Sequence, residues 1–130
     1  MIRINTLVLV GIVASSLFCL PLPSSALESG EHLTKEALEE CHRGRLAIDR
    51  ATRLAHFQQG QIVGERAVAE DEGNADAHFA LFCNLGELLR VDGESLTSLF
   101  GLRRMMHELD RVLELDPAHI DALSAKGTLL

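Results

Sequence analysis

The chain has 130 residues, a formal net charge of −7, and neither Trp nor Tyr. This excess of negative charge repels phosphate backbones and anionic lipid headgroups, so we expect neither nucleic-acid binding nor peripheral membrane binding. Sites that bind sugars or stack bases usually depend on large aromatic rings, and the scarcity of such rings disfavours both ligand classes.

The first 26 residues have the pattern of a secretory signal peptide. A cation at Arg3 precedes an apolar run over residues 7–20, and Ser24 and Ala26 are small residues at the −3 and −1 positions of a cleavage site. The run is shorter than the roughly 20 residues that a membrane-spanning helix needs. We therefore predict cleavage after Ala26 and export of residues 27–130, one small domain, to the periplasm or beyond. The alternative is an uncleaved segment that anchors the chain in the membrane.

Export would carry two cysteines, Cys41 and Cys83, into an oxidising compartment. They could form a disulfide if their Cα atoms lie within about 7 Å of each other. Two free, buried thiols are the favoured reading, because cysteines in apolar helices usually serve only in packing. The sequence leaves this pairing open.

Helix-forming residues dominate the rest of the chain. Proline is absent from residues 33–78, and Ala, Leu, Glu and Arg are frequent there. The spacing of apolar residues predicts helices from about 33 to a pause near 44–49, from about 54 to 70, from 77 to about 90, from about 99 to 115, and from 120 onward. In the turn over residues 71–76, we expect Gly73 to take a left-handed conformation and Asn74 or Asp76 to cap the next helix.

An internal repeat accompanies these helices. The segment AVAEDEGNADA, residues 67–77, aligns without gaps on VLELDPAHIDA, residues 112–122, at an offset of 45. Both segments fall where one predicted helix ends and the next begins. Such self-similarity is typical of proteins built from stacked helical pairs.

The second junction resembles a known repeat family. Residues 112–127, VLELDPAHIDALSAKG, are similar to the junction of tetratricopeptide repeat (TPR) proteins, in which a helix ends in Leu-Asp-Pro and the next helix begins with Ala and continues to a Gly. The resemblance implies an all-α fold, a short α-α superhelix of TPR-like units over residues 27–130. The period of 45 exceeds the 34 residues of the family, which places an insertion near residues 91–101. The resemblance assigns packing between helices to Ala77, Leu81, Leu109, Val112, Pro117, Ala122 and Gly127.

The resemblance also implies a binding groove. In TPR proteins the first helices of successive pairs line a concave face that receives a peptide segment. The positions that correspond to this face are Asp76, Phe79, Cys83, Asp121 and Ser124. An acidic and apolar lining favours a basic or amphipathic protein or peptide partner. For Phe79, burial in the core is an equal alternative, because aromatic residues at helical spacing are usually core residues.

No residue pattern supports catalysis or a cofactor. The six histidines form no His-x-x-x-His pair, and there is no Cys-x-x-Cys-His, no Gly-x-Ser-x-Gly and no phosphate-binding loop. We therefore expect no enzymatic activity, no metal and no cofactor. The predicted function is that of an exported protein–protein interaction scaffold. The alternative rests on a loose similarity to the periplasmic TatT-like partners of TRAP transporters: an accessory component of solute transport that holds a small ligand in an enclosed apolar cavity.

The last residues, KGTLL, fall part-way through a predicted repeat. We therefore expect the last repeat to be truncated. We expect Leu123, Leu129 and Leu130 to form an exposed apolar patch. Such a patch would promote self-association through the C-terminal helix.

Overall fold

The structure, a computed structural model, describes residues 24–92 and 97–129. Within these residues the chain forms five helices and no strand, which confirms the all-α class. The helices are α1 (Ser24–Leu46), α2 (Arg50–Glu70), α3 (Ala75–Asp92), α4 (Thr97–Leu115) and α5 (Ile120–Leu129).

The predicted helices differ from the observed ones chiefly at the start of α1. This helix begins at Ser24, about nine residues before the expected position, so that residues 24–26 of the predicted signal peptide form its first turn. The apolar run over residues 7–20 lies outside the described residues, and cleavage after Ala26 stays a prediction. In the described part of the chain, no helix combines the length and the apolar character that a membrane span requires.

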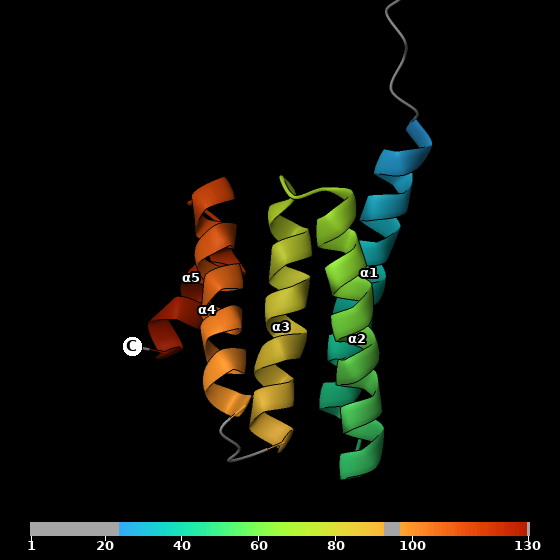
Figure 1. Cartoon of the computed structure of the whole chain (residues 1–130), viewed down its shortest axis with the longest axis vertical. Helices are drawn as coiled ribbons and strands as arrows, with labels where there is room; N and C mark the ends of the chain where they lie inside the picture. Colours follow the sequence, from blue (N-terminus) through green and yellow to red (C-terminus); the bar gives the residue numbers. More distant parts are fainter. Residues whose placement is uncertain (1–23, 93–96, 130) are drawn as a thin grey trace, which may run out of the picture.

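The helices follow one another across the molecule as stacked neighbours (Figure 1). α1 and α2 form an antiparallel pair, and α3 packs against both of them. α4 packs against α3, and α5 packs against α4 at the opposite side of the molecule from α1. Contact of α3 with α1 as well as with α2 is the arrangement expected of stacked helix pairs.

Three glycines inside the helices are points of close packing and interrupt no helix. A Cβ atom at Gly44 would overlap the ring of Phe57, and a Cβ atom at Gly60 would overlap the side chain of Asn84. At Gly64 a Cβ atom would lie 3.2 Å from the Cα atom of Leu81. Glycine lowers helix propensity, and here the small residue lets the helices approach closely.

Most of the packing positions predicted from the TPR resemblance are buried in the core. Five of them have at most 2 % of their surface exposed: Ala77, Leu81, Leu109, Val112 and Ala122. Pro117 is exposed in the turn between α4 and α5. The expectation for Gly127 was wrong: this residue is exposed, and no described atom lies within 4 Å of a Cβ atom built there.

The two repeated junctions have the same backbone structure. Five hydrogen bonds of 3.0–3.3 Å close the turn between α2 and α3; they run from Asp71 N to Ala67 O, Gly73 N to Asp71 Oδ1, Asn74 N to Asp71 O, Ala77 N to Asn74 Oδ1, and His78 N to Asn74 O. The turn between α4 and α5 has the same five bonds, shifted by 45 positions, with His119 Nδ1 in place of the asparagine oxygen. Asn74 is thus the N-cap residue of α3. Gly73 lacks the expected left-handed conformation.

Candidate protein-binding surface

One face of α1 is fixed to α3 by a row of three residues. Asn84 Nδ2 donates a hydrogen bond of 2.9 Å to the carbonyl oxygen of Ala37. One helical turn further on, Cys41 forms a disulfide with Cys83, and after another turn Arg45 Nε donates to Glu87 Oε1 at 2.7 Å. Because these contacts lie at every fourth residue of α1, they hold α1 and α3 side by side over about two turns.

The disulfide corrects two expectations. Cys41 and Cys83 are bonded to each other, with their Cα atoms 6.3 Å apart, and are not the free thiols that we favoured. Cys83 is also buried, with 7 % of its surface exposed, so it does not line an open groove as predicted. Its role is to join the first helices of two successive pairs.

Asn84 is a residue of this region that sequence reasoning missed. Its side chain is fully buried, and Nδ2 also donates to the carbonyl oxygen of Ala80 at 2.9 Å. Its Oδ1 faces Gly60 and has no hydrogen-bond partner among the described residues. The available signal was an asparagine within the apolar run of α3, where a buried amide must find backbone partners.

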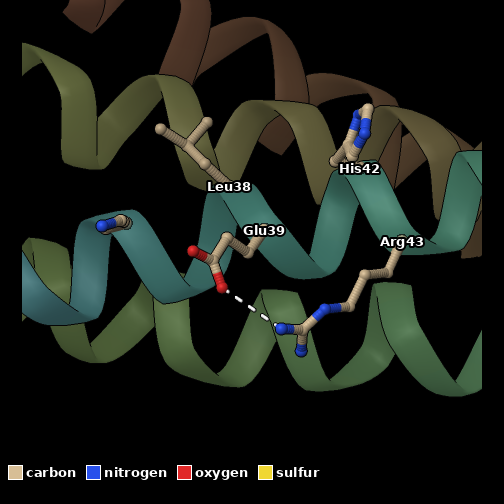
Figure 2. Close-up of a pocket in the computed structure, with 5 residues that line it drawn as sticks. Leu38, Glu39, His42 and Arg43 are labelled. Carbon is tan, nitrogen blue, oxygen red and sulfur yellow. Dashed lines mark hydrogen bonds and ion pairs between the residues drawn. The ribbon is translucent and has the colours of Figure 1, made fainter.

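A shallow hollow of about 450 Å³ lies on α1 beside this row. Figure 2 shows two rows of side chains there: Leu38 and His42 point to one side, and Glu39 and Arg43 point to the other, where they form an ion pair of 3.2 Å. Leu38 follows Ala37 and His42 follows Cys41, and both Ala37 and Cys41 contact α3. Leu38 and His42 therefore border the surface shared by α1 and α3. Lys35 completes the lining. No residue of this hollow was predicted to be a site residue.

Two of the predicted groove residues of α3, Asp76 and Phe79, lie next to the start of α5. Asp76 is exposed, and its Oδ1 lies 3.1 Å from Nε2 of His119. Phe79 is half-buried, and its ring centroid lies 4.9 Å from that of His119. Phe79 packs against the cluster that joins α3, α4 and α5. Of the two alternatives for this residue, packing in the core therefore describes it better than exposure in a groove. Asp121 and Ser124 are exposed on α5.

His119 orders this part of the surface through both ring nitrogens. Nδ1 accepts a hydrogen bond from the backbone N–H of Ala122, so Nε2 carries the hydrogen that is donated to Asp76. The ring thereby acts as the N-cap of α5 and links this helix to α3. This role has little signal in the sequence, because histidine is a rare N-cap residue.

A buried pair, His78 and Glu108, joins α3 to α4 on another side of α3. His78 Nδ1 lies 2.6 Å from Glu108 Oε2, and His78 Nε2 lies 3.1 Å from the carbonyl oxygen of Glu72. Because a carbonyl oxygen only accepts, Nε2 is the donor in the second contact. Both side chains border an open hollow of about 460 Å³, with Arg111 and Glu114 at its rim. The pair connects α3 to α4 by side chains that are both buried.

The described residues include no group of three or more His, Cys, Asp or Glu side chains placed to hold a metal ion. Comparison with known proteins gives no match: no family model fits the chain, and neither a curated protein nor a solved structure matches it. Function must therefore be argued from the surface itself.

Proposed function

We propose that the chain is an exported, non-enzymatic scaffold that binds a protein or peptide segment along a TPR-like groove formed by α1, α3 and α5. The observation that carries this proposal is the repetition of one junction: five hydrogen bonds recur at an offset of 45 residues. Repeated junctions set successive helix pairs in the same relative orientation, and such stacks generate extended concave surfaces.

The residues of the proposed groove have the chemistry of a peptide-binding site. Leu38 and His42 of α1 supply apolar and polar contacts, while Asp76 of α3 and Asp121 of α5 add exposed carboxylates. The disulfide and the buried hydrogen bonds beneath keep the backbone of this surface rigid. Rigid surfaces lose little entropy on binding, which favours affinity for an extended or helical segment.

Export is supported by the disulfide. Disulfides form and persist in oxidising compartments such as the periplasm, and they are rare in the cytosol. The bond between Cys41 and Cys83 therefore agrees with the signal-peptide pattern of the first 26 residues.

The alternative function, a small-ligand component of a TRAP-type transport system, calls for an enclosed apolar cavity. The hollow on α1 is open to solvent, and charged or polar side chains make up most of its lining. The hollow beside His78 is lined almost entirely by charged and polar side chains. Neither hollow supports a role in binding a small ligand for transport.

Selection from a random peptide display library tests the proposal. Recovered peptides should be rich in Lys, Arg and aliphatic residues, because the surface carries exposed carboxylates. Their affinity should fall by about tenfold or more in the variants Asp76→Lys and Asp121→Lys. The matched charge reversal Glu114→Lys, on α4, should leave it unchanged. Recovered peptides whose binding falls only in the Glu114→Lys variant would refute the proposed groove.

A further inference from the structure

α5 buries little apolar surface in the helix stack. It has 10 residues, which is too few for a helix to be stable in water by itself. Of its described residues Ala122 alone is buried, while Ile120 is 80 % exposed and Leu123 and Leu129 are each about half exposed. The hydrogen bonds of its first turn are therefore a large part of what keeps α5 folded in place.

One of these hydrogen bonds is accepted by a side chain that can take up a proton. The N–H of Ala122 donates to Nδ1 of His119 at 3.2 Å, and Nε2 of the same ring lies 3.1 Å from Asp76 Oδ1. A ring nitrogen that accepts a hydrogen bond carries no hydrogen, so this arrangement requires the neutral ring. At the first junction the equivalent acceptor is Oδ1 of Asn74, an amide oxygen that does not change charge between pH 5 and 8.

We propose that protonation of His119 opens the first turn of α5, so that the second junction responds to pH and the first does not. Histidine is the side chain whose charge ordinarily changes between pH 5 and 8. A protonated ring donates from both nitrogens, so Nδ1 can no longer accept from Ala122. Because Ala122 is fully buried, water cannot replace the ring as acceptor unless the turn opens. The positive end of the helix dipole also opposes a cation at this position.

The charges around His119 do not keep the turn closed. Asp76 attracts the protonated ring, but its side chain is 71 % exposed, and exposed ion pairs contribute little to stability. This contact uses Nε2, so it is compatible with an open turn in which Nδ1 donates to water. The other charged groups of this junction have partners or face solvent: Asp110 pairs with Lys126, Asp116 accepts from the N–H of Ala118, and Asp121 is exposed.

The other contacts between a histidine and a carboxylate of another helix lack this property. Nδ1 of His56 faces Glu40 Oε2 at 2.7 Å, and both ring nitrogens of His78 face oxygen acceptors. Within the described residues, neither ring accepts a hydrogen bond from a backbone N–H, so an added proton removes no backbone acceptor there. The response to mild acid should therefore be confined to α5.

The opening would act on the proposed peptide groove. Asp121, one of the groove carboxylates, lies in the first turn of α5. Peptide binding should therefore weaken as the pH falls from about 8 to about 5.5, the range in which histidine gains its charge. This consequence rests on the proposed function, whereas the opening of the turn does not.

NMR of the disulfide-bonded chain between pH 8 and 5.5 tests the opening without a peptide, so its failure is distinguishable from failure of the proposed function. At the upper pH, the side-chain nitrogen shifts of His119 should show hydrogen on Nε2 and none on Nδ1. As the pH falls, the Cα shifts of residues 120–123 should move from helical toward unstructured values. The ratio of closed to open turn should drop about fivefold, the effect of losing an average N-cap.

Two substitutions separate the cap from the ion pair. His119→Asn gives the second junction the cap of the first, so the Cα shifts of α5 should stay helical over the whole range. Asp76→Asn removes the attraction and keeps the cap, so its α5 should still open in acid. Four results would overturn the proposal: Cα shifts of α5 that do not respond to pH, an equal response in His119→Asn, a response abolished by Asp76→Asn, or hydrogen on Nδ1 at the upper pH.

Discussion

Reduction of the disulfide between Cys41 and Cys83 should lower the free energy of unfolding by about 4 kcal/mol at 25 °C. The bond closes a loop with a sequence separation of 42 residues. In the chain-entropy relation, a loop of this length removes roughly 13 cal/mol/K from the entropy of the unfolded chain, which corresponds to this free energy. A single domain is stable by about 5–15 kcal/mol in total, so the loss would be a large part of its stability.

Urea unfolding monitored by circular dichroism, with and without a reductant, measures this difference directly. The native helical signal should persist after reduction, while the midpoint shifts to lower urea concentration. The double variant Cys41→Ala/Cys83→Ala serves as the control, because its midpoint should not respond to the reductant. A reduced protein that is less stable by under about 1 kcal/mol would contradict the loop-closure reasoning.

Three further predictions concern the packing and the caps. Gly60→Ala should cost about 1–3 kcal/mol of stability, because the added methyl group would overlap a buried side chain, whereas Gly127→Ala in open space should cost nothing; chemical denaturation compares the two. His78→Ala should cost about 3–5 kcal/mol in the same assay, because it leaves the Glu108 carboxylate buried without its partner; equal stability would refute a structural role for the pair. Hydrogen bonds from the side chain and backbone of Thr52 lower the pKa of the Asp49 carboxyl below its unfolded value of 3.8. The carboxylate therefore stabilises the fold above that pH, and this contribution is lost as the pH falls through the lower folded pKa. Acid titration of stability should therefore show a smaller loss in Asp49→Asn.

Local rules were sufficient to predict the junctions. Asn74 and the apolar positions around it obey capping and periodicity rules that act within a few residues, and the structure confirms the cap. The repeat at an offset of 45 was visible because both turns use the same local chemistry. The start of α1 was placed too late, since the apolar spacing that marks this helix begins only at Leu33.

Contacts between distant segments could not be predicted from one sequence. The disulfide, the pair of His78 with Glu108, and the amide of Asn84 each join helices that are 30 to 47 residues apart along the chain. Periodicity places such residues on a helix face, but only the packing of the helices determines which faces meet. For the same reason Cys83 was assigned to the groove, although it lies beneath the surface next to α1.

Amide chemical-shift mapping by NMR tests the central claim most directly, with a peptide recovered from the display selection as the probe. The account predicts shifts that concentrate on residues 35–45 of α1 and on the exposed side of α3 around Asp76 and Phe79, with little change on α2 and α4. Shifts confined to α2 and α4 would contradict the account, because they would place the binding surface on the opposite side of the helix stack.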